Sequence, residues 1–296
     1  MIMNKVVCAV MITYNRVDSL KTALDYYFNQ SSKSAGLIIV DNNSSDGTRE
    51  FLTSLQGQKD IYCIHLSSNI GAGGGYSLAM TYALDHMHPD YFWMIEDDTY
   101  YEKNALCELL HHIEASSYDM IRLKGFKNNF GSTINVVGNN QLQPVESALL
   151  DGSLIKADII RKIGPPKKEY FMMCDDYEFC LRMKKNGHKI ALINIQSANY
   201  LHLGGEGKFT QSTLWRGYYT SRNHLLILRE YFSIVDLLSY MYKQLKYLIA
   251  AAVFAPDRWK RIRFRLLGMW HGILGKQGKT LDPSTLKFIK TNKAFI

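Results

Sequence analysis

Residues 91–98 of the chain are Tyr91-Phe92-Trp93-Met94-Ile95-Glu96-Asp97-Asp98. The apolar part predicts a short buried strand, and three adjacent carboxylates follow it directly. Such a cluster is unfavourable in a fold, because like charges repel and each carboxylate loses hydration. A divalent cation, which prefers oxygen ligands, would offset that cost. A solvated acidic turn, or the charged start of a following helix, is the structural alternative.

The alternation of side chains along a strand gives the acidic triplet an expected geometry. Glu96 and Asp98 would point to one side and Asp97 to the other. That arrangement would suit a metal ion that in turn binds a diphosphate.

The region before the triplet alternates short strands with helices. Residues 6–12 are almost continuously apolar, which is typical of a parallel strand buried on both faces. Residues 18–30 have helical spacing, with Asp18 or Ser19 as the expected N-cap. The same signals predict strands at 37–40, 61–66 and 91–95 and helices at 48–55 and 75–85. This alternation predicts an α/β fold with a Rossmann-like, mostly parallel, doubly wound sheet.

Polar residues follow each expected strand at its carboxyl end, where ligands bind in sheets of this kind. One polar loop means little, but a set of them at one sheet edge predicts a site of nucleotide size. The loops are Thr13-Tyr14-Asn15-Arg16, Asp41-Asn42-Asn43-Ser44-Ser45-Asp46-Gly47, Ser67-Ser68-Asn69-Ile70-Gly71 and Glu96-Asp97-Asp98.

The run from Asn69 to Tyr76 is rich in glycine and stands between an expected strand and helix. Such a turn lets the backbone approach a ligand and directs helix N–H groups at phosphate. It does not continue as a Walker motif, and its spacing matches the dinucleotide fingerprint poorly. Close packing of helix on strand is the structural alternative.

Beyond residue 120 the pattern becomes that of a mixed or antiparallel extension. Strands are expected at 121–123, 134–137, 151–155 and 189–195, with a helix at 175–185. That helix opens on Asp175-Asp176-Tyr177-Glu178, where one aspartate could act as a general base. A capping box between Asp175 and Glu178 is the structural alternative. His202, which precedes flexible glycines, is the nitrogen ligand expected near the acidic triplet, although a lone histidine is more often structural.

The net charge of +8 is concentrated in the last quarter of the chain. Residues 224–296 contain 13 Lys and Arg against 4 Asp and Glu, whereas residues 1–223 contain 22 against 23. We therefore expect one domain over 1–223, with a change of pattern at about 120 that divides it into two halves, and a basic helical region over 224–296.

The segment 243–279 places Trp259 and Trp270 at helical spacing among basic residues. A basic amphipathic helix with tryptophans predicts a partner with an anionic membrane surface. A helical cap on the catalytic domain, or an interface in a homo-oligomer, is the alternative. No recognised nucleic-acid motif occurs, so we expect no nucleic-acid partner.

The cysteines and the length of the apolar segments indicate in which cellular compartment the protein is expected. The five cysteines are odd in number and form no CxxC pair, which suits buried thiols in a reducing compartment. No stretch approaches 18 apolar residues, and the start lacks a signal-peptide pattern. The expectation is a cytoplasmic protein, peripheral at the inner face of the membrane.

Taken in order, these motifs resemble those of the family 2 inverting nucleotide-sugar glycosyltransferases of the GT-A type, over about residues 5–225. Within that family, the glycine run, Trp93 and Tyr218-Tyr219-Thr220-Ser221-Arg222-Asn223 look most like the galactofuranosyltransferase branch. Rhamnosyltransferases share the last feature. The branch usually has three aspartates in the acidic triplet, and here the first is Glu96.

The resemblance implies roles for individual residues. Asp176 would deprotonate the acceptor hydroxyl, with Asp175 as the second catalytic candidate. Mn²⁺ or Mg²⁺ would be held by Asp98, Glu96 and His202. The residues implied in donor binding are Thr13, Arg16, Asp41, Asn69, Gly71, Glu96 and Asp97.

The implied reaction transfers galactofuranose from UDP-galactofuranose to a glycan or lipid-linked acceptor in cell-surface polysaccharide synthesis. The hydroxyl would attack the anomeric carbon from the face opposite the leaving diphosphate. A rhamnosyl- or hexopyranosyltransferase of the same family is one alternative. A non-catalytic protein that binds sugar nucleotides or membranes, with Glu96 marking a decayed metal site, is another.

Overall fold

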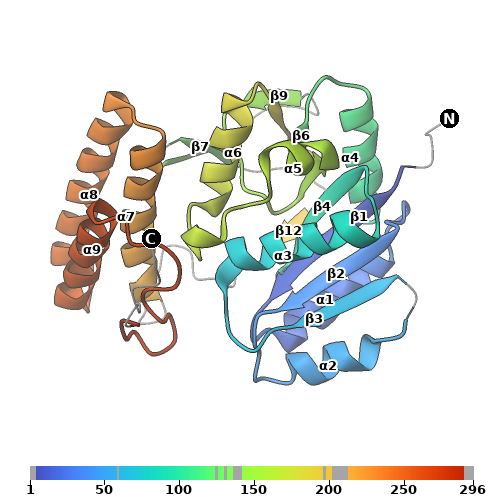
Figure 1. Cartoon of the computed structure of the whole chain (residues 1–296), viewed down its shortest axis with the longest axis horizontal. Helices are drawn as coiled ribbons and strands as arrows, with labels where there is room; N and C mark the ends of the chain where they lie inside the picture. The colour runs from blue at the N-terminus through green and yellow to red at the C-terminus, as the bar shows by residue number, and fades with distance from the viewer. Residues whose placement is uncertain are drawn as a thin grey trace.

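The computed structural model describes residues 5–58, 60–123, 126–129, 132–135, 142–195, 198–201 and 213–289. Figure 1 shows a sheet flanked by helices on one side of the molecule and a group of long helices on the other. The expected α/β class and its basic helical appendage are therefore confirmed for the described chain.

The main sheet is mixed, with a parallel part followed by an antiparallel extension. Strand β10 runs antiparallel to both β4 and β6, while β6 and β11 are parallel and β9 forms the antiparallel edge. In spatial order its strands are β3 (Ile61–His65), β2 (Gly36–Asp41), β1 (Val7–Thr13), β4 (Tyr91–Glu96), β10 (Ser153–Lys156), β6 (Met120–Leu123), β11 (Ile190–Ile193) and β9 (Leu142–Val145).

The register of the parallel strands aligns the residues predicted to form a site. Thr13 of β1 pairs with Asp41 of β2, and Asp41 pairs with His65 of β3. Ile12 of β1 pairs with Glu96 of β4. The polar ends of these strands thus lie at one edge of the sheet, as the alternating pattern predicted.

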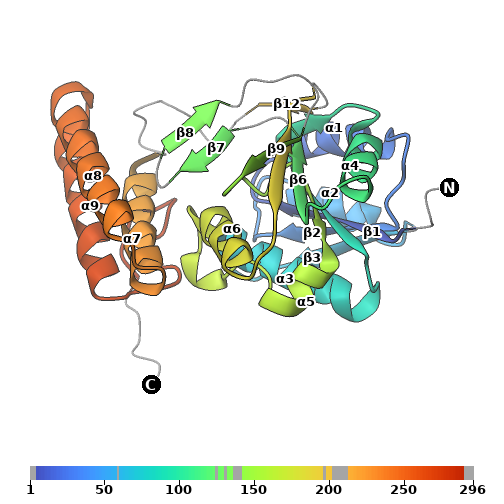
Figure 2. The ribbon, with the colours of Figure 1, turned by 90° about the horizontal axis from the view of Figure 1, so that it is seen from above.

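Helices cover both faces of the sheet, as Figure 2 shows from above. One apolar core joins the sheet to α1 (Val17–Phe28), α2 (Thr48–Leu55) and α4 (Ala105–Glu114). The opposite core joins it to α3 (Gly71–His86), α5 (Ala157–Ile163) and α6 (Asp175–Lys185). Two small sheets, β5 (Thr99–Tyr101) with β12 (Ala198–Tyr200) and β7 (Phe126–Asn129) with β8 (Ser132–Asn135), and the 3-10 turn η1 (Lys168–Tyr170) complete these layers.

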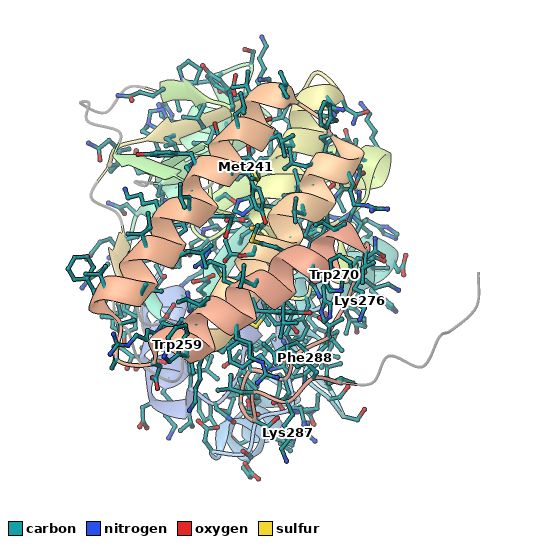
Figure 3. The ribbon with its side chains drawn as sticks, turned by 90° about the vertical axis from the view of Figure 1, so that its left-hand side faces the viewer. Met241, Trp259, Trp270, Lys276, Lys287 and Phe288 are labelled. Atoms are coloured by element: carbon teal, nitrogen blue, oxygen red, sulfur yellow. The ribbon has the colours of Figure 1, made fainter. Side chains whose placement is uncertain are left out.

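The C-terminal region consists of α7 (Leu214–Glu230), α8 (Ile234–Phe254) and α9 (Arg258–Ile273). Figure 3 views α8 and α9 from outside. Helix α9 lies very close to α7, since a Cβ added to Gly268 would come within 2.3 Å of the Tyr218 carbonyl oxygen. The boundary expected between residues 223 and 224 falls inside α7, so the helical region begins earlier than the charge pattern suggested. Within the described residues, no helix combines the length and apolarity needed to cross a bilayer.

Two local expectations were wrong. The N-cap of α1 is Arg16, neither Asp18 nor Ser19, and the backbone N–H of Val17 instead donates to Asp46. Helix α3 begins at Gly71 and not at Gly75, so most of the glycine run lies inside its first turn. The close approach of a neighbouring segment, described below, explains why glycines stand there.

Candidate active site

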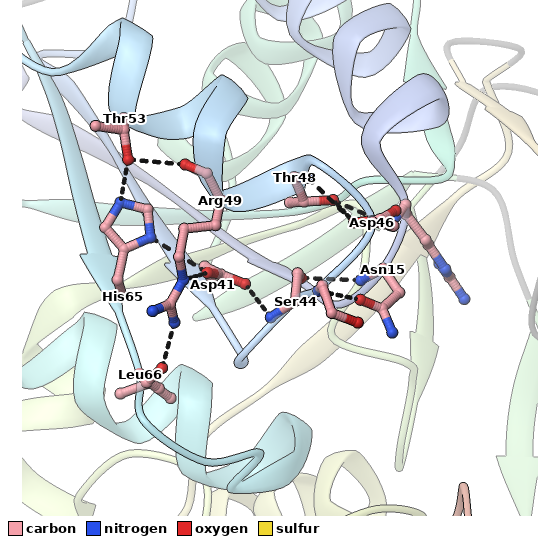
Figure 4. A network of polar contacts seen from close by, with 11 residues as sticks. Asn15, Asp41, Ser44, Asp46, Thr48, Arg49, Thr53, His65 and Leu66 are labelled. Carbon is pink, nitrogen blue, oxygen red and sulfur yellow. Dashed lines mark hydrogen bonds and ion pairs between the residues drawn. The ribbon is translucent and has the colours of Figure 1, made fainter.

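A polar network holds the loop after β2, as Figure 4 shows. Asp41 is fully buried and accepts hydrogen bonds from the Ser44 backbone (2.8 Å), Arg49 Nε (3.1 Å) and His65 Nδ1 (3.2 Å). Burial acts to raise its pKa, but these hydrogen bonds prevail and lower the pKa of Asp41 below its ordinary value. Asp41 therefore anchors the loop; its predicted contact with the nucleotide stays a prediction.

Arg16 brings Asp97 and Asp98 together. Its Nη1 lies 2.8 Å from Asp97 Oδ1 and 2.7 Å from Asp98 Oδ2, and Thr13 Oγ1 donates to Asp97 Oδ2 at 2.7 Å. The expectation that Asp97 would point away from Asp98 was wrong, because β4 ends at Glu96 and strand alternation ends with it. Burial raises the pKa of Asp97 to about 6, against the opposing effects of Arg16 and Thr13.

Asp151, which the sequence analysis did not single out, acts electrostatically on Glu96. Burial, then the charges of Asp151, Asp98 and Asp97, raises the pKa of Glu96 well above its usual range. Asp151 is in turn held by Arg122, whose Nε donates to the Asp151 carbonyl oxygen at 2.6 Å and whose Nη2 lies 3.5 Å from its carboxylate. An arginine inside the apolar strand 120–123 was the signal in the sequence that could have revealed this pair.

The start of α3 packs tightly against another part of the site. Gly71 has a φ of +79°, and a Cβ there would come within 2.0 Å of the Phe171 carbonyl oxygen. Asn69 Oδ1 accepts from the Gly71 N–H at 2.8 Å, while the Asn42 side chain accepts from Ile70 N and donates to the Gly71 carbonyl. Glycine is required here for backbone conformation and close approach.

The segment that contacts α3 has unusual backbone geometry. Phe171, Met173 and Cys174 all have positive φ, at 62°, 70° and 65°. Such conformations cost on the order of 1–3 kcal/mol each and persist only when neighbours impose them. Asn223 of α7 does so, because its side-chain amide lies 3.0, 2.8 and 2.7 Å from the carbonyl oxygens of Tyr170, Met172 and Met173.

Asp175 and Asp176 follow this constrained segment directly and open α6. The alternative of a capping box between Asp175 and Glu178 was wrong, because the N-cap residue is Cys174. The Glu178 carboxylate instead lies 3.1 Å from Arg182 Nη2 and 3.1 Å from Lys167 Nζ. Asp175 is buried and Asp176 half-buried. Burial, and then the charge of Asp176, raises the pKa of Asp175. Burial also raises the pKa of Asp176, although a hydrogen bond from the Tyr177 N–H and the charge of Arg122 act to lower it.

Tyr76 comes from the glycine-rich helix α3 and is buried. Burial, then the charges of Glu96, Asp151, Asp175 and Asp97, raises its pKa well above the usual range. The phenol therefore lies within electrostatic reach of both ends of the site. Tyr76, Asp151 and Arg122 are the members of this arrangement that sequence reasoning missed.

His202 lies outside the described residues, so its expected place beside the triplet is untested. Among the described side chains, no three from His, Cys, Asp and Glu form a ready metal-binding group. The arrangement nevertheless supplies several buried carboxylates near two arginines, and a half-buried carboxylate at a helix start. Those are the groups needed to bind a charged diphosphate and to accept a proton.

Solved structures show the same architecture. Residues 1–349 of TarS from S. aureus superpose with a TM-score of 0.61 at 14% identity, covering 90% of this chain and 81% of that one. GalNAc-T7 with UDP, GalNAc and Mn²⁺ superposes with a TM-score of 0.66 at 9% identity, covering 90% and 55%. At such identities the likeness establishes the fold alone, which is the GT-A fold.

Relatives of known name match along the sequence. The galactofuranosyltransferase GlfT1 of Mycolicibacterium smegmatis is 28% identical over 228 residues, covering 69% of this chain and 73% of its own. The low-salt glycan biosynthesis hexosyltransferase Agl10 of Haloferax volcanii is 22% identical over 293 residues, covering 91% and 92%.

The model of the family described as "Glycosyl transferase family 2" matches residues 8–150, the part that contains the parallel strands and the acidic triplet. The order of motifs along the chain, the GT-A fold and the named relatives agree with that match. Residues 8–150 of the chain therefore match the glycosyl transferase family 2 model, and the fold around them is that of a GT-A glycosyltransferase.

Proposed function

We propose that the protein is an inverting galactofuranosyltransferase that uses UDP-galactofuranose and a glycan or lipid-linked acceptor in cell-surface polysaccharide synthesis. The observation that carries the proposal is a set of two acidic groups: Asp97 and Asp98, which pair with Arg16 after β4, and Asp175 with Asp176 at the start of α6. One group suits the donor diphosphate and the other the acceptor hydroxyl. The match to GlfT1, a named galactofuranosyltransferase, supports the choice of sugar.

Asp176 is the proposed general base. It is half-buried at the first turn of α6, and burial raises its pKa towards the working pH of an enzyme. It would accept the proton of the acceptor hydroxyl as that oxygen attacks the anomeric carbon opposite the diphosphate. Asp175 is more enclosed, and the charge of Asp176 adds to burial in raising the pKa of Asp175.

Thr13, Arg16, Asp41, Asn69, Gly71, Glu96 and Asp97 are the proposed donor-binding residues. Arg16 is half-exposed while its carboxylate partners are buried, so part of its guanidinium remains accessible to a phosphate. The N-terminus of α3 at Gly71 supplies backbone N–H groups and a positive dipole end. Asp41 would act by holding the loop after β2, through the network of Figure 4.

Mn²⁺ or Mg²⁺ is the proposed cofactor. The residues present fit a hard cation, because Glu96, Asp97 and Asp98 offer only oxygen donors, and a cation would relieve the repulsion that raises the pKa of Glu96. Asp98 and Glu96 would hold it, with His202 as the third expected ligand. When bound, the metal supplies stabilisation of charge on the leaving diphosphate.

The proposed membrane partner is an anionic surface bound by residues 243–279, which would place the protein peripherally at the inner face of a membrane. Trp259 and Trp270 of α9 are 77% and 55% exposed, as a membrane-binding role requires. Their basic neighbours supply the attraction to anionic lipid. Such a surface would bring a lipid-linked acceptor to the enzyme.

A hexosyltransferase of other sugar specificity is the second candidate. It is favoured by Agl10, a named hexosyltransferase whose match extends over 91% of this chain. The relatives give no support to a non-catalytic binder, since those named above are transferases.

A panel of nucleotide-sugar donors, incubated with Mn²⁺ or Mg²⁺ and a simple galactoside acceptor, tests the proposal. We expect transfer from UDP-galactofuranose in preference to other UDP- or dTDP-sugars, loss of transfer with a chelator, and inversion at the anomeric carbon by NMR of the product. Preference for another donor would replace the sugar assignment. Retention of configuration would exclude the direct attack assigned to Asp176.

A further inference from the structure

Helices α8 and α9 carry a broad apolar face. On α8, Leu238, Met241 and Leu245 repeat at helical spacing and are more than half exposed. Figure 3 shows Met241 together with Trp259 and Trp270 of α9 on the face turned outward from the catalytic half. Contiguous apolar surfaces of this kind mark a place where a protein or a membrane docks.

The charge around this face favours lipid over a second copy of the chain. Residues 224–296 contain 13 Lys and Arg against 4 Asp and Glu. A second copy would bring the same positive charge to the interface and be repelled, whereas an anionic bilayer supplies both apolar chains and negative headgroups. The favoured occupant of the face is therefore an anionic membrane.

A cavity of about 300 Å³ lies at the C-terminal part of α9. Three of its described lining residues have basic side chains, Arg263, His271 and Lys276, and none of the lining residues is acidic. The rest of the lining is Leu267, Thr280, Phe288 and Ile289. Figure 3 shows Lys276 and Phe288 on the same outward face as Trp270.

The basic groups are held in place by a chain of hydrogen bonds. Lys276 Nζ lies 3.3 Å from His271 Nε2, and His271 Nδ1 lies 2.6 Å from the Tyr218 hydroxyl. That hydroxyl and Arg222 both lie 2.7 Å from Thr280 Oγ1. Burial, then the positive charges of Lys276 and Arg222, lowers the pKa of His271. The described lining contains no carboxylate to balance Arg263 and Lys276.

We propose that this cavity binds the phosphate group of an anionic membrane lipid, with the acyl chains lying against Phe288 and the apolar face of α8 and α9. Arg263 and Lys276 would pair with the phosphate oxygens, and Thr280 would add a hydroxyl donor. The proposal rests on the membrane association proposed above and gives it a specific headgroup site, separate from the site for the nucleotide diphosphate.

Titration of the full-length protein with dihexanoyl phosphatidic acid, kept below its micelle concentration and followed by calorimetry, tests the site. Dihexanoyl phosphatidylcholine controls for the apolar chains, and inorganic phosphate controls for the anion alone. We expect binding of the phosphatidic acid, much weaker binding of inorganic phosphate and none of the phosphatidylcholine. Saturating UDP should leave the lipid affinity unchanged, because the two sites are separate.

The matched variants are R263Q/K276Q in the cavity and K103Q/K162Q at two exposed positions of the sheet domain, which remove the same charge. The cavity variant should bind the phosphatidic acid about thirtyfold more weakly, roughly fivefold for each cation, and the control variant should bind it as the wild type does. Thermal melts verify that both fold.

Several results would overturn the proposal: equal losses in the two variants, competition by UDP, equal affinity for inorganic phosphate, or no binding by the wild type. None of them depends on sugar transfer. A protein that bound the lipid but transferred no sugar would contradict the proposed reaction and leave the headgroup site intact.

Discussion

The sheet domain buries its apolar side chains, whereas the helices α8 and α9 leave most of theirs exposed to solvent. The strands β1, β2 and β4 bury theirs almost completely between two layers of helices. In α8, a helix of 21 residues, only Tyr240, Gln244 and Ala251 are buried. The first region therefore contains its own stabilising core, whereas the second has an apolar surface that its own fold leaves in water. The difference agrees with the proposed roles, in which the sheet domain transfers the sugar and α8 and α9 dock on a membrane.

The substitution with the largest expected effect in the sheet domain is Asp98→Ala. It removes a proposed metal ligand and one of two carboxylates paired with Arg16. We expect transfer to be abolished and metal-dependent nucleotide binding to weaken strongly, while binding to anionic vesicles is unchanged. Transfer assays and nucleotide titrations with and without metal check this. Activity like that of the wild type would remove the metal role.

Asp176→Asn should keep the fold and donor binding but lower turnover by roughly 10²–10⁴-fold, the range for loss of a general base. Turnover at saturating donor is the measurement, and nucleotide affinity is its control. A lower melting temperature with intact turnover would show that Asp176 is structural, and Asp175 would be the next residue to test.

The pH profile gives the same residue a second test. Because burial raises the pKa of Asp176, the wild-type base should become protonated, and turnover fall, at a pH well above the 3.8 of an ordinary aspartate. The same shift means that folding favours the protonated form, so this group's contribution to stability declines as pH rises through the raised pKa. An acid limb near 3.8 would contradict the assigned environment.

In the helical region, Leu238→Ser with Leu245→Ser should weaken binding to anionic vesicles about thirtyfold, from about 1 kcal/mol of lost apolar burial per side chain. Transfer to a short soluble acceptor should survive. Phe28→Ser, at an exposed apolar residue of α1, is the matched control. Vesicle flotation is the measurement, and equal losses in both variants would remove the special role of α8.

Asn223→Ala tests one of the contacts between helix α7 and the segment that precedes Asp175 and Asp176, and its expected effect is the smallest. Loss of its hydrogen bonds to the 170–173 backbone should destabilise the fold by about 1–3 kcal/mol and lower turnover roughly tenfold by displacing Asp176. The control is Ser221→Ala, also in α7, which loses a buried hydrogen bond to Gln244 of α8. This control should lower the stability of the fold and leave turnover unchanged. If both variants keep full turnover, Asn223 does not position the catalytic segment.

Much of this molecule could be predicted from local patterns. Continuous apolar runs bounded by polar loops identified the parallel strands, and α2 and α6 were predicted with the bounds that the structure shows. The register of those strands then accounts for the placement of Thr13, Asp41 and Glu96 at one edge. These features depend on neighbours in sequence and on the fixed geometry of parallel strands.

Other features were decided by contacts between distant segments. Strand β4 ends at Glu96, so Asp97 and Asp98 can both pair with the guanidinium of Arg16. Asp151, paired with Arg122, adds a further carboxylate from the antiparallel extension of the sheet. Phe171, Met173 and Cys174 have positive φ values, and Asn223, about fifty positions along the chain, bonds to the backbone of that segment. Local propensity carries no signal for such partners, since their energy comes from burial and pairing that exist only once the chain has folded.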